Sequence, residues 1–406
     1  MHSDSKSRVD TIDIMRGITL FLMLFVNDLF EPGVPHWLVH AGTYENSIGL
    51  ADLVFPAFLF IVGLSVPLAI EARKWKPGNH NLSHLLYHII LRTASLLIIG
   101  VLILNGSERL NADLTRIPKY IWLLLLYLGV FLVWNNYKGF LVRHGSGSKQ
   151  LTILLKIIGI LLLGYLVWKF KAGDELNASW IKHGWWGILG LIGWGYFAAA
   201  LTYIIAGPSV KWSLVICFFF LFLNIASLSG WLGQSDWGGL RDLLSVWISG
   251  NVPFITTAGL VVGLLLQQTP NKGRLIKLLL LSGGVCVLLG FELRQWFIFS
   301  KNIGTPSWAM VCIGVSLLLL ALLYYIVEIK EYKRWALIFQ LAGRNALTTY
   351  LAPDMIYFIV WYLGGQLFFY KQAGTLWLAI GGSTAWALIM ILYGSLLSKV
   401  SIRLKL

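Results

Sequence analysis

Charged residues are scarce in this sequence. They make up 12% of the 406 residues, whereas about a quarter of a typical soluble domain is charged. Hydrophobic residues make up 57% of the chain, which leaves little room for a soluble domain between the apolar runs. The composition is that of a polytopic membrane protein whose main partner is the lipid bilayer.

Acidic residues, cysteines and soluble-enzyme motifs are also few or missing. The 18 Asp and Glu against 32 Lys and Arg give a formal net charge of +14, which would suggest a nucleic-acid partner in a soluble protein. We attribute it instead to basic cytoplasmic loops and expect no nucleic acid. The three cysteines each lie inside an apolar run, so no disulfide framework is expected. No Walker A, G-x-S-x-G or H-E-x-x-H motif occurs, and the first apolar run lacks a signal cleavage site.

Long apolar runs are what the sequence does have. Twelve of them reach the length that a membrane-spanning helix needs. They predict an all-α fold of about 12 transmembrane helices in one bundle, which we treat as a single domain over residues 1–406. The runs lie near Thr11–Phe30, Gly49–Ile70, Ser83–Asn105, Lys119–Tyr137, Leu151–Phe170, Trp185–Ala206, Trp212–Leu228, Val252–Gln268, Leu275–Phe299, Ser307–Val327, Asn345–Leu363 and Leu376–Leu397.

Lys and Arg are distributed unevenly among the loops. An even number of spans places both termini on one side, together with the loop that holds Arg73 and Lys76. Loops on that side are rich in Lys and Arg, whereas the opposite loops, including the one with His40, hold most loop acids. The positive-inside rule therefore predicts cytoplasmic termini and an outer location for His40. We expect a multi-pass protein of the inner (plasma) membrane.

The stretch between the first two spans carries the most informative polar residues. Asp52 precedes some eighteen uncharged residues, and an ionisable group at membrane depth costs roughly 2.5–3.5 kcal/mol or more, which makes it a functional candidate. Asp52 could equally cap the helix that follows it. His36 and His40 stand four apart, a spacing that could bind a metal on a helix, but Pro35 indicates a loop. We therefore expect no metal.

A few charged residues lie inside the predicted spans. Asp13 and Arg16 are three apart and so share one helix face, either as an ordinary ion pair or as an anion-contacting arginine oriented by the aspartate. Arg92 lies about ten residues into the third span. Glu292 and Arg294 are too close in sequence to face each other on a helix, so each is expected to have another partner.

The sequences VDTIDIMRGITLFLMLFVND and HAGTYENSIGLADLVFPAFLFIVG resemble the opening of the catalytic membrane domain of the heparan-alpha-glucosaminide N-acetyltransferase family. Residues 1–105 are the most specific part of the resemblance, and residues 185–228 look like an added helix pair. The motif elements that carry it are Val9-Asp10, Arg16-Gly17, Phe25-Val26-Asn27, His40-Ala41 and Ala51-Asp52-Leu53-Val54-Phe55-Pro56. Weaker likeness resumes at Arg92, Asn105, Arg116-Ile117-Pro118, Lys301-Asn302, Pro306-Ser307-Trp308 and Asn345.

The resemblance implies transfer of an acetyl group from cytoplasmic acetyl-CoA to an amino sugar or glycan acceptor on the other side of the membrane. On this interpretation His40 is the base, Asn27 donates to the oxyanion or clamps the substrate, and Asp52 orients the imidazole. Arg16 and Arg92 are candidates for the CoA phosphates. The candidates for contacts to the acceptor are Asn105, Arg116, Lys301, Asn302, Ser307, Trp308, which could stack on a sugar face, and Asn345.

Two other functions stay open from the sequence. Twelve spans and polar residues inside them are also typical of a secondary transporter of a sugar or amino-sugar derivative, which would not need acetyl-CoA. A structural or assembly membrane protein is the third, although the specific N-terminal motifs argue against it. A homodimer is one candidate assembly.

Overall fold

The computed structural model describes residues 9–74, 82–137, 148–233, 239–365, 371 and 375–406. Within these ranges the secondary structure is helical, and β-pairing is limited to isolated bridges. The all-α prediction is confirmed. A long helix occupies each of the twelve predicted apolar runs: α1 (Asp10–Asp28), α2 (Leu50–Lys74), α3 (Leu82–Leu104), α5 (Lys119–Trp134), α7 (Ser148–Lys169), α8 (Gly187–Ala206), α9 (Val210–Leu228), α12 (Asn251–Gln268), α13 (Lys272–Leu293), α14 (Pro306–Tyr324), α16 (Ala346–Tyr362) and α17 (Leu376–Lys399).

Not all twelve helices are equally suited to cross a bilayer. Among the described residues, nine helices are long and apolar enough to do so. The other three are α1, which carries several charged residues, and α5 and α16, which have only 16 and 17 residues. The nine long apolar helices among the described residues indicate a membrane protein, while the count of twelve spans and the cytoplasmic location of the termini stay predictions.

Shorter helices connect the long ones. They are α4 (Ala112–Thr115), α10 (Gly239–Leu243), α11 (Ser245–Ile248) and α15 (Leu337–Arg344), together with π-helical turns at Asn105–Arg109 and Tyr325–Ile329 and 3-10 turns at Glu31–Gly33, His36–Leu38, Glu175–Asn177 and Arg334–Ala336. Of these, α15 matters most for function because it packs against α1 and reaches the cavity described below.

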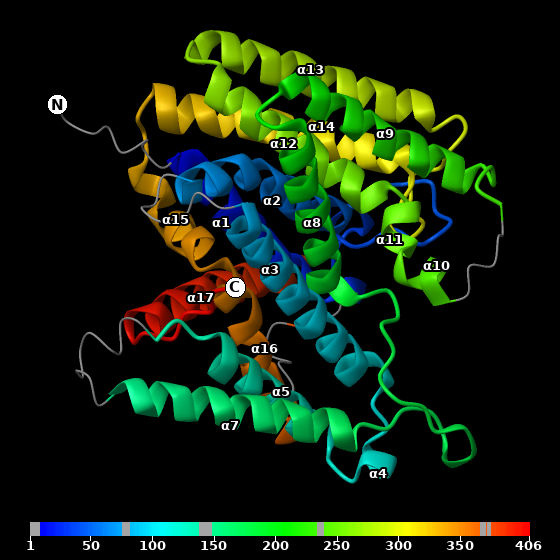
Figure 1. Ribbon diagram of the computed structural model, residues 1–406, viewed down its shortest axis with the longest axis vertical. Helices are drawn as coiled ribbons and strands as arrows, with labels where there is room; N and C mark the ends of the chain where they lie inside the picture. Colours follow the sequence, from blue (N-terminus) through cyan, green and yellow to red (C-terminus); the bar gives the residue numbers. More distant parts are fainter. Residues whose placement is uncertain (1–8, 75–81, 138–147, 234–238, 366–370, 372–374) are drawn as a thin grey trace.

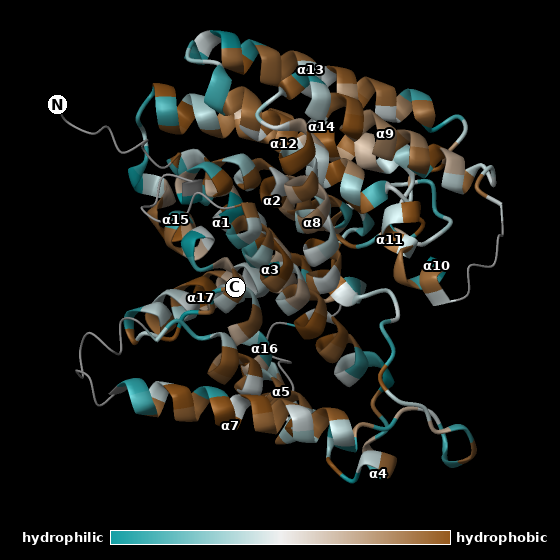
Figure 2. Ribbon diagram, viewed as in Figure 1, coloured by the Kyte–Doolittle hydropathy of each residue, from teal (hydrophilic) through white to brown (hydrophobic). Residues whose placement is uncertain are grey.

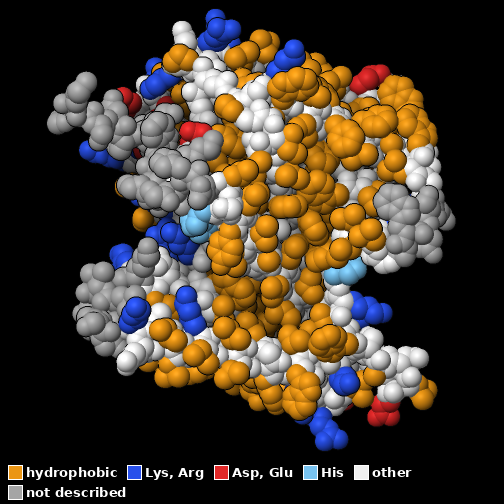
Figure 3. Space-filling model, viewed as in Figure 1, with side chains coloured by type: hydrophobic (Ala, Val, Ile, Leu, Met, Phe, Trp, Pro, Cys, Tyr) orange, Lys and Arg blue, Asp and Glu red, His pale blue; other side chains and the backbone are white. Residues whose placement is uncertain are grey.

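The long helices form one bundle with α13 and α14 at one end and α5 and α7 at the other (Figure 1). Helices α1, α2, α3, α8 and α12 lie between them, and the C-terminal end of the chain reaches the middle of the molecule. Hydrophobic residues dominate the long helices (Figure 2), and their side chains cover much of the face seen in Figure 3. Leu161 on α7 and Leu288 on α13 are examples of exposed apolar side chains that suit contact with lipid.

Glycines allow two pairs of central helices to touch backbone to backbone. A Cβ atom on Gly17 or Gly343 would lie only 1.8 or 1.9 Å from a carbonyl oxygen of the facing helix, so α1 and α15 are in direct contact. Helices α2 and α12 meet in the same way at Gly63 and Gly259, where the corresponding distances are 1.8 and 2.0 Å. Because lipid is as apolar as leucine, membrane helices associate through close packing of this kind together with interhelical hydrogen bonds.

An ion-pair network fixes the start of α1 beside α15. The Asp10 carboxylate lies 3.0 Å from Lys333 Nζ and accepts a hydrogen bond from Gln340 Nε2 at 2.6 Å. The Asp13 carboxylate lies 3.2 Å from Arg16 and 3.5 Å from Arg344. The expected Asp13–Arg16 pair is thus present, and it forms part of a larger network that positions both arginines.

Candidate functional site

His40 and Asp52 form a short, oriented pair. His40 lies in the loop after the turn His36–Leu38, and Asp52 lies in the first turn of α2, where it is 2% exposed. His40 Nδ1 is 2.7 Å from Asp52 Oδ1, and Asp52 Oδ2 accepts hydrogen bonds from the backbone N–H groups of Ala41 and Gly49 at 3.0 and 3.1 Å. An ionised carboxylate only accepts, so the proton lies on Nδ1 and the Nε2 lone pair of the neutral ring can take a proton.

Lys301 contacts the same histidine. It lies on the loop between α13 and α14, and its Nζ is 3.2 and 3.3 Å from the two ring nitrogens of His40. Burial lowers the pKa of Lys301 from the ordinary lysine value, while the negative charge of Asp52 opposes that shift. The sequence had suggested Lys301 for the acceptor; the structure places it directly against the candidate base.

We expect the amine of Lys301 to react with acetic anhydride at lower pH than an ordinary lysine. Only the neutral amine reacts, and a lowered pKa means that the proton is lost earlier as pH rises. The Asp52→Asn variant should shift the midpoint lower still, because it removes the charge that keeps Lys301 protonated. Peptide mapping of acetylation across a pH series measures both midpoints; a Lys301 midpoint at or above that of exposed lysines contradicts this environment.

Hydrogen bonds join two loops: residues 39–49, which carry His40 and which we name the histidine loop, and the loop that carries Lys301. Asn46 Oδ1 accepts hydrogen bonds from Arg294 Nε at 3.0 Å and from the Phe299 backbone N–H at 2.9 Å. Ser300 Oγ donates to the Thr43 carbonyl at 2.7 Å. Arg294 therefore pairs with the histidine loop, whereas Glu292 accepts from Gln295 on its own side, so the expectation of separate partners is confirmed.

Asn302 and Ser307 belong to the same assembly. Asn302 Nδ2 donates to Thr43 Oγ1 at 2.9 Å, and the side chain of Asn302 is exposed. Ser307 is fully buried and donates to the Ile298 carbonyl at 3.0 Å. Asn302 therefore joins the loop of Lys301 to that of His40, while Ser307 holds the backbone of its own loop.

Trp308 contacts the backbone of Asp52. Its indole N–H donates to the backbone carbonyl of Asp52 at 3.2 Å, and the side chain is 2% exposed. The sequence suggested that Trp308 stacks on a sugar, but a buried indole has no free face for one. Its position makes it a residue that fixes the first turn of α2.

The remaining residues proposed for this end of the molecule are more scattered. Asn27 is exposed in the last turn of α1, and no hydrogen bond joins it to His40 or Asp52 within the described ranges. Asn105 is fully buried and uses its amide on Val101, Arg109 and the Lys182 backbone, which is a structural role. Arg116 is exposed at the end of α4, in a left-handed conformation.

The two histidines of this loop face different partners. His36 Nε2 lies 3.4 Å from Glu45 Oε2 on the exposed side of the loop, whereas His40 turns inward to Asp52. No group of three or more metal-ligating side chains occurs among the described residues. The pair at His36 and His40 does not converge on one point.

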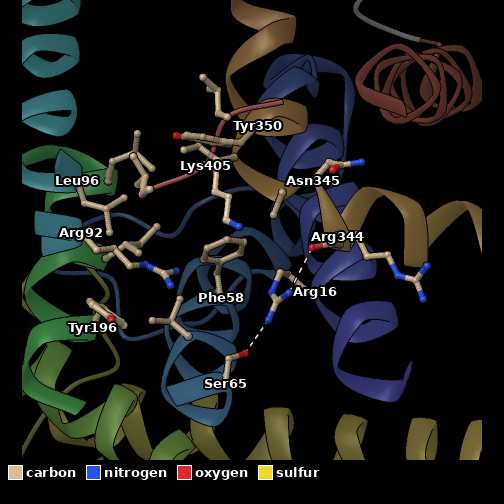
Figure 4. Close-up of a pocket in the computed structure, with 18 of the residues that line it drawn as sticks. Arg16, Phe58, Ser65, Arg92, Leu96, Tyr196, Arg344, Asn345, Tyr350 and Lys405 are labelled. Atoms are coloured by element: carbon tan, nitrogen blue, oxygen red, sulfur yellow. Dashed lines mark hydrogen bonds between the residues drawn. The ribbon is translucent and has the colours of Figure 1, made fainter. Parts of the chain in front are cut away.

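A basic cavity of about 440 Å³ opens along α2, on the C-terminal side of Asp52. Side chains of α1, α2, α3, α8, α15 and α16 line it together with residues 403–406. Lys and Arg gather near the recess at the left of Figure 3, and Figure 4 shows several of them pointing into the cavity. No acidic residue is among its described lining residues, and its six basic ones are Arg16, Arg73, Arg92, Arg344, Arg403 and Lys405.

Some polar side chains of this cavity are fixed by hydrogen bonds, and others have buried atoms without a hydrogen-bond partner among the described residues. Arg16 donates to Ser65 Oγ at 2.6 Å and to the Gly343 carbonyl at 3.3 Å, which fixes its guanidinium at the wall. The guanidinium of Arg92 lies 4.5 Å from the centre of the Tyr196 ring, and its buried Nε has no hydrogen-bond partner among the described residues. The buried Oδ1 of Asn345 is unpartnered in the same part of the structure. Asn345, proposed for substrate binding, thus lies in the basic cavity and not beside His40.

Helix α2 connects the two sites. Asp52 is in its first turn and Arg73 is near its end, so the axial separation is about 32 Å at 1.5 Å per residue, close to the thickness of a bilayer core. The cavity extends along α2 as far as Phe58, about 9 Å short of Asp52 on the same measure. Arg16 and Arg92, the two residues that the sequence indicated for CoA, line only part of this cavity.

Several cavity residues were not expected to act together. From the sequence, Arg73 is only a basic loop residue, and Arg403 and Lys405 have no expected role in a site. Helix α8, within the possible added helix pair, contributes Tyr196 to the wall. Their positive charge was visible in the sequence. Their convergence depends on helix packing that no local pattern encodes.

Comparisons with known proteins place the likeness in the N-terminal part of the chain. A family model described as heparan-alpha-glucosaminide N-acetyltransferase, catalytic, matches residues 8–111. Residues 8–111 are similar to that catalytic family. The segment includes α1, α2, α3 and the loop between α1 and α2, and with them Arg16, His40, Asp52 and Arg92.

Two curated relatives carry the same name. The mouse heparan-alpha-glucosaminide N-acetyltransferase is 37% identical over 117 residues, which are 28% of this chain and 17% of the mouse protein. The human protein is 35% identical over 114 residues, 27% of this chain and 16% of its own length. The match thus spans about a sixth of the relatives, and it confirms the resemblance drawn from the N-terminal motifs.

Proposed function

We propose that this protein is a membrane N-acetyltransferase that moves an acetyl group from acetyl-CoA to the amino group of a glucosamine-type sugar. The observation that carries the proposal is the His40–Asp52 pair with Lys301 at one end of α2 and the basic cavity at the other. The matched segment supplies His40 and Asp52 to the first and Arg16, Arg73 and Arg92 to the second. A proton-accepting imidazole and a phosphate-binding cavity are the two parts that this reaction requires.

The basic cavity is proposed to hold CoA. CoA is a polyanion, and arginine guanidinium groups suit its phosphates because they donate several hydrogen bonds in a fixed plane. Arg16 and Arg92 are the central donors, with Asn345 beside them. The pantetheine arm would then run along α2 past Phe58 toward His40, which requires the remaining distance of about 9 Å to open between the helices.

His40 is proposed as the base. The acceptor amine attacks the thioester carbonyl carbon, forming a C–N bond, while Nε2 of His40 takes the proton that the nitrogen loses. The C–S bond then breaks, and the CoA thiolate receives that proton from the imidazolium. Asp52 is proposed to keep Nδ1 protonated throughout, and Lys301 or the Asn302 amide to donate to the oxyanion.

The two substrates are proposed to approach from opposite faces, acetyl-CoA from the cytoplasm and the sugar from outside. The Lys and Arg bias of the loops and the separation along α2 support this arrangement. The described residues of one chain supply every group named here, so the proposal does not need a homodimer.

Sealed vesicles that contain the purified protein test the proposal. With acetyl-CoA at the face of the Arg73 loop and glucosamine at the face of His40, we expect N-acetylglucosamine and free CoA thiol in equal amounts. Accumulation of unmodified glucosamine without acetyl-CoA would instead support transport. Equal turnover with both substrates on the same face would overturn the two-sided arrangement.

Replacing Arg92 with alanine is expected to raise KM for acetyl-CoA about tenfold, because a charged hydrogen bond to a phosphate contributes roughly 1.5–3 kcal/mol. KM for glucosamine should stay nearly unchanged, since Arg92 lines only the basic cavity. The matched control is Lys277→Ala, which removes an exposed charge on α13 that does not line the cavity. Steady-state kinetics with each substrate varied in turn decide the matter, and a selective loss of sugar affinity would contradict the assignment.

A further inference from the structure

Residues 402–406, which we name the strap, lie across one wall of the basic cavity. Their backbone is fixed to the end of α5: Asn136 N–H donates to the Arg403 carbonyl at 2.8 Å, and Lys405 N–H donates to the Trp134 carbonyl at 3.0 Å. Leu404 N–H donates to Thr348 Oγ1 of α16 at 2.8 Å. The strap is therefore anchored to two helices by its main chain, independently of its charged side chains.

The side chains of the strap face the cavity. Residues 403–406 all belong to its lining, and Leu404 is 6% exposed, so it anchors the strap in the apolar wall. Arg403 donates to the Arg344 carbonyl at 2.9 Å. Figure 4 shows Lys405 extending from the strap toward Phe58, into the space between Arg92 and Arg16.

We infer that Lys405 is the third cation of a phosphate-binding group made with Arg16 and Arg92. This inference rests on the proposed function and deepens it, because it assigns a specific part of the donor site to the strap. The ligand chemistry is a phosphate of CoA, either the 3′-phosphate or the diphosphate.

The electrostatics of the cavity support this assignment. Three cations from separate elements converge on one cavity in which no acidic side chain lies among the described lining residues. Like charges that share a cavity repel one another, and a bound polyanion converts that repulsion into attraction. Because the strap backbone is already ordered, binding does not bear the entropy cost of fixing a loose segment.

Binding of CoA to the purified full-length protein tests the inference by calorimetry. The Lys405→Gln variant is expected to bind CoA about tenfold more weakly than wild type, and Lys405→Arg should restore most of the affinity. The loss should shrink at high salt, because salt screens exposed charges. The control is Lys277→Gln, whose lysine is exposed on α13.

Dephospho-CoA distinguishes the two phosphates. If Lys405→Gln weakens CoA but not dephospho-CoA, Lys405 contacts the 3′-phosphate; if it weakens both equally, Lys405 contacts the diphosphate. Unchanged CoA affinity in Lys405→Gln, with wild type binding CoA, overturns the role of the strap alone. Failure of wild type to bind CoA at all would overturn the proposed function as well.

Discussion

Replacing His40 with alanine is expected to reduce acetyl transfer by about 10³-fold, within the range that a general base usually contributes. The variant loses the Nε2 lone pair that accepts the proton of the attacking amine. It leaves Asp52 with its two backbone donors, Ala41 and Gly49, so the loop retains two of its three contacts to that carboxylate. We therefore expect normal insertion and folding, with the loss confined to kcat.

His36 provides the matched control for this experiment. It lies in the same loop, its side chain is 66% exposed, and its contact is Glu45 instead of Asp52. His36→Ala should retain turnover close to wild type. Rates are compared at equal protein in membranes that carry each variant; near-normal turnover of His40→Ala would remove His40 from the reaction and leave the motif without a base.

The sequence was sufficient for the secondary structure because apolar length is a local property. Helix α1 was expected at Thr11–Phe30 and is found at Asp10–Asp28, and α5 was expected to extend to Tyr137 but ends at Trp134. The number of spans is harder to predict. A helix such as α16 has only 17 residues, and its fitness to cross a bilayer depends on neighbours that composition does not reveal.

In the candidate site, likewise, the contact between residues close in sequence could be predicted and the contacts between distant residues could not. His40 and Asp52 could be paired from the sequence because a motif holds both and only eleven residues separate them. Lys301 meets His40 from 261 positions away, and Lys405 reaches the cavity of Arg16 through the packing of α5 and α16. Trp308 was a candidate for stacking on a sugar through the resemblance at Pro306-Ser307-Trp308, and its burial became evident only once α14 was seen against α2.

Polar atoms without partners were the other feature that a sequence could not provide. Asn105 and Asn345 look alike in the chain, because Asn105 closes one predicted apolar run and Asn345 opens another. The structure shows that the amide of Asn105 is fully used by its own surroundings, whereas the Oδ1 of Asn345 is left unpartnered at the cavity. Only the second is suited to meet a ligand, because a buried acceptor without a partner is costly.

Gly49 is the residue that brings the histidine loop against α2, and substituting it should be nearly as harmful as removing a catalytic group. A Cβ atom at Gly49 would lie 1.8 Å from the carbonyl oxygen of Val39, the residue before His40. The Gly49→Ala variant must therefore displace the backbone that carries the imidazole. Its own N–H also donates to Asp52, so the carboxylate is disturbed together with the base.

A displacement of about 1 Å at a reacting group can lower the rate by about 10²-fold, and we expect that loss in kcat for Gly49→Ala. The control is Gly42→Ala in the same loop, where the added carbon would make ordinary contacts of 3.5 and 3.6 Å with Glu45 and should be tolerated. Affinity for CoA should be unchanged in both variants, because neither glycine lines the basic cavity. Turnover of Gly49→Ala equal to that of Gly42→Ala would show that the close approach at Val39 does not position His40 for the reaction.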